Sequence, residues 1–434
     1  MESRGNLHLA PPVKTIDGLV AVPIDIQNLY AHVIFDMVAQ RASVEATLEF
    51  LMGVEDGNPI FDLRQNIKEA WINNEPIDIE KLRHHDFGGG PGAELIILEK
   101  AISKGSKNIL KLHYELNKPN CPESQDIGWD TPRLYFEFWF TDLHPARYLE
   151  MWFPSNLIYD QFKFSINVEI TNTMIEHILF SNGEVNRLSL NHWQIEFPES
   201  FTSLSPMLCI LAKDTIEHIQ NSMILPDNGS KLDLLTFKKL ETSEVDVQEV
   251  ETRIREYITK NVINIGKYIH GGKFITFIWP VSGRSMEYDG AVTTEVDALK
   301  HEIFHSWFGR GVKPRSQNDG WIDEAWDVYN TGLYNNNPFN MNDPPIMLSS
   351  SNPFERITPS TSYTEGPRFF ATLASLIGDD NLHLYMRSFY QEFKQCLITT
   401  KQLESYLINK SGIAKISDYF LRFVYGLDNH SDSD

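Results

Sequence analysis

The stretch His301-Glu302-Ile303-Phe304-His305, with Glu324 after eighteen intervening residues, decides how the second half of this chain must fold. An H-E-x-x-H sequence on a helix places two imidazoles one turn apart on one face, where both reach the same zinc ion. The glutamate between them then lies beside the metal and accepts a proton from a zinc-bound water. A catalytic zinc takes three protein ligands and keeps one position open. Glu324, where the next helix is expected to start, is the predicted third ligand.

The apolar residues around the two histidines predict that their helix packs in a core. A stripe at helical spacing contains Val296, Leu299, Ile303, Phe304 and Trp307. The alternative, a polar histidine pair on a solvated surface helix, does not account for this stripe. The motif residues then lie at the margin of the core, facing a cleft. Buried histidines and a carboxylate without partners cost free energy, and a metal ion removes that cost.

Capping and turn signals bound the two expected helices. Thr294 begins an approximate capping box for the first helix, and Gly309 is expected to end it. Asn318 or Asp319 is expected to cap the helix that carries Glu324. The interval between the ligands therefore spans a helix end, a loop and a helix start, as two ligands on adjacent antiparallel helices require.

Length and charge limit the classes of function. The 434 residues allow two or three domains, and the net charge of −21 with a pI near 5.1 argues against nucleic acid and anionic membranes as partners. No stretch approaches the roughly twenty apolar residues that span a bilayer, and no apolar core follows Met1. The three cysteines are odd in number and far apart, which predicts reduced thiols in a cytoplasmic protein: Cys121, Cys209 and Cys396.

The chain changes character near the Pro, Asp, Asn and Gly cluster at residues 226–229. We expect a β-rich domain over residues 1–228 and a mixed α and β domain over residues 229–434. Alternating stretches predict strands at 30–36, 46–52 and 134–140 in the first part and at 274–279 in the second, followed by an edge segment at 291–293. Helical periodicity predicts helices at 247–265, 367–377, 381–393 and 402–409.

Four stretches together resemble the gluzincin zinc aminopeptidases, of the aminopeptidase N and leukotriene-hydrolase type. His305-Ser306-Trp307-Phe308-Gly309 is similar to the family's His-Gln-Trp-Phe-Gly, and the residues from Trp321 to Ala325 are similar to its Trp-Leu-Asn-Glu-Gly. Ser362-Tyr363-Thr364-Glu365-Gly366 resembles its Tyr-Glu-Lys-Gly. Ser285-Met286-Glu287-Tyr288 resembles Gly-Ala-Met-Glu-Asn, the signature of exopeptidases in this family.

The resemblance implies an α+β fold, with an N-terminal β-rich, saddle-like domain followed by a thermolysin-like catalytic domain. It implies one Zn2+ per chain on His301, His305 and Glu324, with Glu302 as the general base. The implied activity is that of a zinc metallopeptidase that removes N-terminal residues from a peptide or small amide substrate. Members of this family usually carry a further C-terminal helical domain, which we expect to be missing from this chain.

Two further site residues are implied by the resemblance, each with an alternative. Tyr363 would stabilise the oxyanion, or its ring would only pack with its hydroxyl on a backbone partner. Glu287 would bind the substrate's α-amine, or it would be a structural carboxylate beside Arg284. The family's Asn after that glutamate is Tyr288 here, and only fourteen positions separate Glu287 from His301. These departures keep open a zinc endopeptidase and a dedicated amide or epoxide hydrolase. A non-catalytic binding protein that kept the scaffold is a further alternative.

Overall fold

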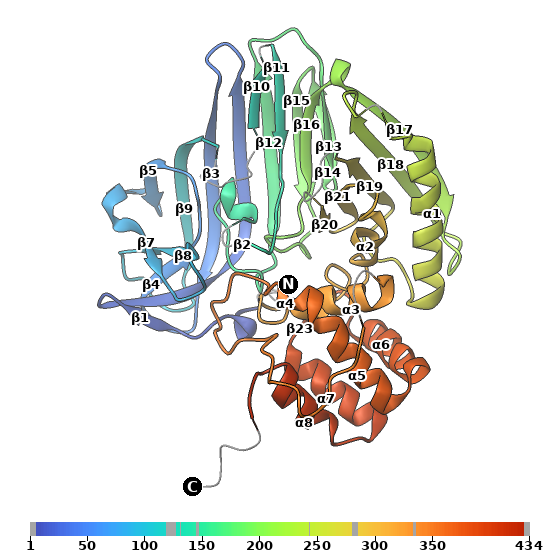
Figure 1. Cartoon of the computed structure of the whole chain (residues 1–434). Helices are drawn as coiled ribbons and strands as arrows, with labels where there is room; N and C mark the ends of the chain where they lie inside the picture. The colour runs from blue at the N-terminus through green and yellow to red at the C-terminus, as the bar shows by residue number, and fades with distance from the viewer. Residues whose placement is uncertain are drawn as a thin grey trace. The chain divides into compact units, whose positions relative to one another are not determined.

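The computed structural model describes residues 6–118, 127–130, 132–144, 147–242, 244–279, 285–332 and 336–428. The described chain divides into two compact units (Figure 1). One contains residues 1–218 and 237–244, and the other contains residues 219–236 and 245–434. The α+β fold class predicted from the sequence is confirmed. The predicted domain boundary between residues 228 and 229 stays a prediction.

The first unit is built on a twelve-stranded sheet whose main path runs β14-β15-β12-β2-β3-β9-β5-β6, with β1, β4, β7 and β8 branching from it. The strands are β1 (Lys14–Ile16), β2 (Leu19–Asp36), β3 (Arg41–Met52), β4 (Asn58–Phe61), β5 (Ile67–Ile72), β6 (Glu75–Ile77), β7 (Leu82–Asp86), β8 (Glu94–Leu98), β9 (Lys107–Leu116), β12 (Lys163–Thr171), β14 (Glu184–Ser189) and β15 (His192–Phe197). β3 alternates buried and exposed residues along its length, so one face of the sheet is apolar. The long strands β2 and β3 pair antiparallel from Asp36↔Arg41 to Ile24↔Met52.

A second, four-stranded sheet of this unit has the order β10-β11-β16-β13. Its strands are β10 (Ile127–Asp130), β11 (Arg133–Glu137), β13 (His177–Ser181) and β16 (Leu208–Ala212). Aromatic residues fill the core beside it, where the Phe136 ring stands edge-on to Trp152 at 4.9 Å between centroids. Short 3-10 turns complete the unit at Leu7–Leu9, Ile79–Lys81, Leu149–Met151 and Lys213–Thr215.

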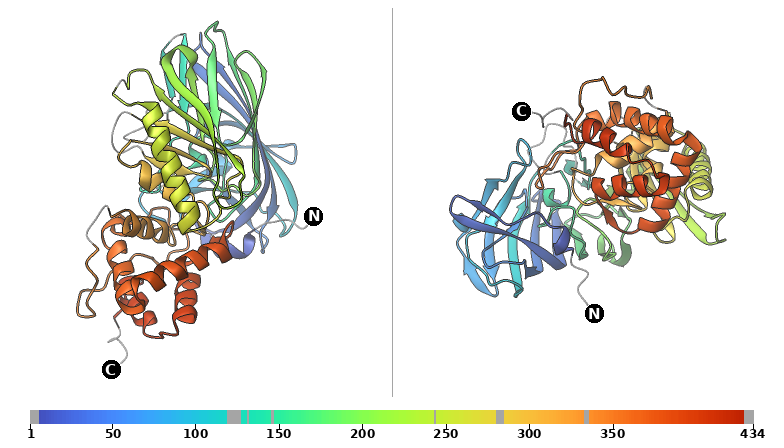
Figure 2. Two further views of the ribbon diagram at one scale, coloured as in Figure 1. Left: turned by 90° about the vertical axis from the view of Figure 1, so that its right-hand side faces the viewer. Right: turned by 90° about the horizontal axis from the view of Figure 1, so that it is seen from below.

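The second unit combines eight helices among the described residues with a five-stranded sheet, of which only residues 216–218 of β17 and 237–239 of β18 are assigned to the first unit. The sheet order is β17-β18-β19-β21-β20, with β17 (Ile216–Ile224), β18 (Lys231–Lys239), β19 (Lys273–Ile278), β20 (Met286–Tyr288) and β21 (Ala291–Thr294). Helix α1 (Val247–Asn264) covers one face of the sheet (Figure 2, left), because its buried stripe with Ile254 and Ile258 joins the same core as Leu234 of β18. The helix and strand predicted at 247–265 and 274–279 therefore form within a residue or two of the expected bounds.

The remaining helices follow the sheet and pack on one another (Figure 1). They are α2 (Leu299–Phe304), α3 (Trp321–Thr331), α4 (Thr361–Thr364), α5 (Gly366–Ile377), α6 (Asp379–Phe393), α7 (Thr400–Ser411) and α8 (Ile416–Phe423), with a short strand pair β22 (Lys313–Pro314) and β23 (Leu397–Ile398). Trp321 of α3 is fully buried against Phe369 and Phe370 of α5. No helix in the described ranges is long and apolar enough to cross a membrane.

The expected helix ends and the expected edge segment are wrong in detail. Thr294 is the last residue of strand β21, so α2 begins at Leu299 after Ala298 and has no side-chain cap. Helix α3 begins after Gly320, because the Asp319 carboxylate instead accepts hydrogen bonds from the backbone N and Oγ1 of Thr400. Strand β21 lies inside the sheet between β19 and β20, so the edge position belongs to β20.

Candidate metal centre

Helix α2, the residue directly after it and helix α3 bring the three predicted ligand side chains together. His301 lies in α2, His305 is the C-cap residue of α2, and Glu324 lies in α3. The Nε2 atoms of His301 and His305 are 3.2 Å apart. The Glu324 Oε2 atom lies 3.3 Å from the first and 3.5 Å from the second. Tetrahedral zinc with bonds of about 2.0–2.1 Å separates its ligand atoms by about 3.3–3.4 Å. The three side chains therefore fit a single zinc ion.

The environment of these side chains also fits a metal. His305 is fully buried, and Glu324 is 3% exposed. The buried Oε2 atom of Glu324 receives no hydrogen bond from any described residue, although it faces two histidine nitrogens. His305 Nδ1 lies 3.2 Å from the Phe308 carbonyl oxygen. Because this oxygen accepts a hydrogen bond from Nδ1, the other ring nitrogen, Nε2, is left to bind a metal. A buried carboxylate oxygen without a donor is costly, and a cation satisfies it.

Asp327 is a carboxylate of this centre that the sequence analysis missed. It follows Glu324 by three residues on α3 and is fully buried. Its Oδ2 lies 2.9 Å from His301 Nδ1 and 3.4 Å from His305 Nε2, so it completes a second possible ligand set with the two histidines. The i, i+3 spacing from Glu324 on a helix is the sequence signal that would have indicated it.

Glu302 lies in the same cluster and is 4% exposed. Burial raises the pKa of its carboxyl group to about 8, the nearby Glu287 contributes in the same direction, and the two histidines oppose the rise. Its Oε2 is buried and receives no hydrogen bond from a described residue. A bound divalent cation would favour the ionised form of this carboxylate.

Opposite charges dominate the electrostatics of the ligand residues. Burial disfavours the charged form of His301, but Asp327 and Glu324 outweigh burial and raise its pKa well above the usual value. The pKa of His305 is raised in the same way, against burial, by Glu287 and Glu324. The pKa of Glu324 is lowered although burial alone would raise it, because both histidines favour its ionised form.

Tyr363 of α4 lies beside the cluster, with its ring centroid 6.3 Å from that of His301. Helix α4 packs on α3, and its neighbour α5 begins with Gly366 directly against Ala325. A Cβ atom on Gly366 would lie 2.3 Å from the Ala325 Cβ, so a residue without a side chain is needed for this close approach. The glycine of the motif thus allows the segment with Tyr363 to pack closely against the helix that carries Glu324.

Glu287 is brought to the same centre from the edge strand β20. It is 7% exposed, and its Oε1 accepts a hydrogen bond from Arg310 Nη2 at 2.7 Å. One ligand atom each of Glu287, His305 and Asp323 lie within 4.8 Å of one another. Arg284, the partner considered from the sequence, lies outside the described residues. Arg310 was missed because it reaches Glu287 across 23 positions of the chain.

Comparison with known proteins defines the fold. No family model matches the sequence. A curated leucine aminopeptidase 2 of Vanderwaltozyma polyspora is 34% identical over 71 residues, which are 16% of this chain and only 10% of the yeast protein.

Solved structures match over nearly the whole chain. An M1 zinc metallopeptidase of Deinococcus radiodurans bound to a Tyr-Ser-Ala substrate has a TM-score of 0.64 at 16% identity, covering 93% of this chain and 95% of that one. Aminopeptidase A of Legionella pneumophila has a TM-score of 0.65 at 11% identity, over 96% of this chain and 51% of that one. Leukotriene A4 hydrolase of Saccharomyces cerevisiae has a TM-score of 0.63 at 15% identity, over 91% of this chain and 66% of that one. The chain therefore has the fold of the M1 zinc metallopeptidases.

Proposed function

We propose that this chain is a zinc metallopeptidase that removes residues from the N-termini of peptides. His301, His305 and Glu324 hold the zinc ion. The observation that carries this proposal is the spacing of 3.2–3.5 Å among their three ligand atoms. That spacing occurs in a fold shared with enzymes named as M1 zinc metallopeptidases and aminopeptidases.

The reaction divides among the residues of the centre. A zinc ion held by His301, His305 and Glu324 would supply Lewis acidity, toward a water and toward the carbonyl group of the scissile bond. Glu302 takes the proton from the attacking water and delivers it to the leaving amine. Tyr363 donates a hydrogen bond to the oxygen on which negative charge develops. Burial of the whole cluster strengthens each of these interactions, since the local dielectric is low.

Asp327 has a positioning role in this proposal. Its Oδ2 lies 2.9 Å from His301 Nδ1, at ion-pair distance. In this proposal Asp327 holds the proton on Nδ1 of His301, so that Nε2 of the same imidazole is left unprotonated for the metal. The same carboxylate adds a negative charge near the two histidines. A carboxylate–histidine pair of this kind fixes the tautomer and the ring orientation of a zinc ligand.

Glu287 determines which peptide bond is cut, in our proposal, by binding the free α-ammonium of the substrate. Arg310 holds Oε1 of this carboxylate and so fixes its direction toward the metal cluster. A second candidate function rests on the same contact. Because Arg310 already neutralises Glu287 in a buried ion pair, the carboxylate could be structural, and the enzyme would then be an endopeptidase or a small-molecule amide hydrolase.

Cleavage of a peptide pool separates these functions. Each peptide is present free and N-acetylated, and products are identified by mass spectrometry. We expect only free peptides to shorten, one residue at a time. Equal cleavage of both forms, or no cleavage by the zinc-loaded protein, would contradict amine recognition and favour the second candidate function.

Two variants complete that experiment. Glu302→Gln should retain one zinc per chain and lose turnover by about 100-fold or more, since a general base contributes about that factor. Undiminished cleavage by this variant would contradict the catalytic assignment. Glu287→Gln should keep its contact to Arg310 through the amide oxygen, and we expect it to lower kcat/KM for free peptides while leaving zinc content unchanged.

A further inference from the structure

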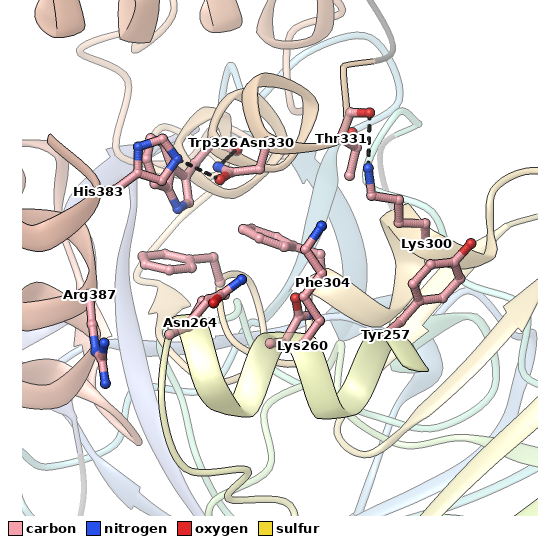
Figure 3. Close-up of a pocket in the computed structure, with 13 residues that line it drawn as sticks. Tyr257, Lys260, Asn264, Lys300, Phe304, Trp326, Asn330, Thr331, His383 and Arg387 are labelled. Carbon is pink, nitrogen blue, oxygen red and sulfur yellow. Dashed lines mark hydrogen bonds between the residues drawn. The ribbon is translucent and has the colours of Figure 1, made fainter. Parts of the chain in front are cut away.

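A cavity of about 420 Å³ lies within the second unit, between α1, α2, α3 and α6 (Figure 3). Its volume falls in the range of about 300–1,000 Å³ that small-molecule sites occupy. The residues that line it are Tyr257, Lys260, Asn261, Asn264, Ile265, Lys300, Phe304, Phe308, Trp326, Asn330, Thr331, His383 and Arg387. None of the proposed zinc ligands is among them, and neither are Glu302, Tyr363 and Glu287.

The helical positions explain why this cavity is separate from the metal centre. On α2, Lys300 and Phe304 are one turn apart and line the cavity, whereas His301 and the residue after it face the metal cluster. On α3, Trp326 and Asn330 are likewise one turn apart and line the cavity. The cavity and the metal centre therefore use different faces of the same two helices.

The cavity has an aromatic floor. Phe304 and Phe308 are buried and nearly parallel, with ring centroids 6.1 Å apart, and Phe308 stands edge-on to Trp326 at 6.2 Å. The His383 ring lies 5.2 Å from that of Trp326. Flat apolar surfaces of this kind bind rings or short hydrocarbon groups.

Basic side chains also line this cavity, beside the aromatic rings. Lys260 and Arg387 are exposed, and neither forms an ion pair with any residue in the described ranges. Lys300 donates to the Thr331 carbonyl oxygen at 3.1 Å, and His383 Nε2 lies 3.1 Å from Asn330 Oδ1 (Figure 3). The described lining contains no carboxylate. His383 Nδ1 lies 3.5 Å from Asp379 Oδ1, so Lys260 and Arg387 are two lining cations for which the described residues supply no counter-ion. In a chain with a net charge of −21, two such cations beside one cavity depart from the overall charge.

We propose that this cavity binds a small organic anion, a carboxylate or phosphate group joined to a flat apolar body. The apolar body rests on Phe304, Phe308 and Trp326. Lys260 and Arg387 pair with the anionic group from α1 and α6. Because the occupant contacts α2 and α3, it lies against the two helices that carry the candidate metal ligands.

Isothermal titration of the full-length, zinc-loaded chain at constant ionic strength tests this site. The probes are phenyl phosphate and phenylacetate, with inorganic phosphate and benzyl alcohol as controls that lack the apolar body or the charge. We expect one site per chain for at least one aromatic anion, with a Kd at least tenfold lower than that of either control. The stronger of the two aromatic anions indicates whether the natural ligand carries phosphate or carboxylate.

Charge-reversal variants place the binding in the cavity. Lys260→Glu and Arg387→Glu should each raise the Kd at least tenfold, whereas Arg387→Lys keeps the charge and most of the affinity. Lys68→Glu, the same change at an exposed lysine of β5, should leave the Kd unchanged. Absence of binding by both aromatic anions, or binding that neither cavity variant weakens, overturns the proposal. An anion that binds the zinc ion itself would keep the same Kd in both cavity variants, and this result would also overturn the proposal. The outcome of the peptide-cleavage experiment does not depend on whether the cavity binds an anion.

Discussion

Asp327 shows how a single residue changes the interpretation of the motif. The H-E-x-x-H sequence predicts two imidazoles on one face, but it does not say what holds each ring in its tautomer. The Asp327 carboxylate on α3 lies 2.9 Å from His301 Nδ1, at ion-pair distance, and is the group that we propose for this role. Arg310 has a comparable role toward Glu287, because it holds one carboxylate oxygen at 2.7 Å in a buried pair.

We predict that Asp327→Asn lowers zinc affinity by about 10- to 100-fold, the usual effect of losing a carboxylate that orients a histidine ligand. The amide keeps the shape of the side chain but removes its negative charge. Competition with a chromophoric zinc chelator measures the change. Asp380→Asn, at an exposed position of α6, is the control and should bind zinc as tightly as the unaltered chain. Unchanged affinity in Asp327→Asn would show that this residue does not support the metal.

A second prediction concerns Asp160 of the first unit. Burial raises its pKa well above the usual 3.8, and the charge of Asp25 adds to the rise. The folded state therefore binds the proton more tightly than the unfolded state. The associated stability is complete below about pH 4 and is lost as pH rises through the folded-state pKa. The variant Asp160→Asn has no ionisable group at this position, so its stability should not fall with pH in this way. Its amide oxygen can still accept the hydrogen bond from the Ile26 backbone N.

The measurement is thermal unfolding of both proteins between pH 5 and pH 8. The Tm of Asp160→Asn minus that of the unaltered chain should increase with pH. Asp130→Asn, at an exposed position at the end of β10, should show a constant difference. A difference that stays constant for Asp160→Asn as well would contradict the raised pKa.

At the scale of elements, the short helix α2 and the packing of α3 on α5 determine the geometry of the centre. Helix α2 contains only Leu299–Phe304, yet buried residues of that segment and the fully buried Trp307 fix it in the core. Helix α3 is fixed by Trp321 and by the close approach of Ala325 to Gly366. Ligands on two packed helices are held more precisely than ligands on loops.

Gly366→Ala should therefore destabilise the chain by about 1–3 kcal/mol, because the new methyl group overlaps the Ala325 Cβ at 2.3 Å. Denaturant unfolding measures the loss. The reciprocal change Ala325→Gly makes room for that methyl group, so the double variant should lose less than the sum of the two single variants. Strictly additive losses would mean that the two helices do not constrain each other at this point.

At the scale of the whole molecule, the described chain forms two compact units, each with its own buried core. All the residues of the candidate metal centre belong to the second unit. The fold is shared with an M1 zinc metallopeptidase at 16% identity and with an aminopeptidase A at 11% identity. A fold that persists at this identity depends on the pattern of burial more than on particular side chains.

Metal removal tests this organisation. Chelation should lower the stability of the second unit, since it leaves several ionisable groups buried without their cation, and added Zn2+ should restore it. At a zinc concentration 1,000 times the Kd, the stabilisation is about 4 kcal/mol. Differential scanning calorimetry with and without chelator measures the shift. An unchanged Tm after chelation would contradict a zinc site.

Features that depend on local spacing could be predicted from the sequence. The i, i+4 histidines with Glu302 between them and the apolar stripes of α1 and α5 follow from helix geometry. The α+β class came from the resemblance of four stretches to a known family, and Glu324 was predicted from its position at the expected start of the next helix. Contacts between distant segments could not be predicted from the sequence and are visible in the folded chain alone. Arg310 reaches Glu287, Asp319 bonds Thr400 in place of capping α3, and β20 takes the sheet edge. These pairings depend on how elements pack in three dimensions, and no local pattern encodes them.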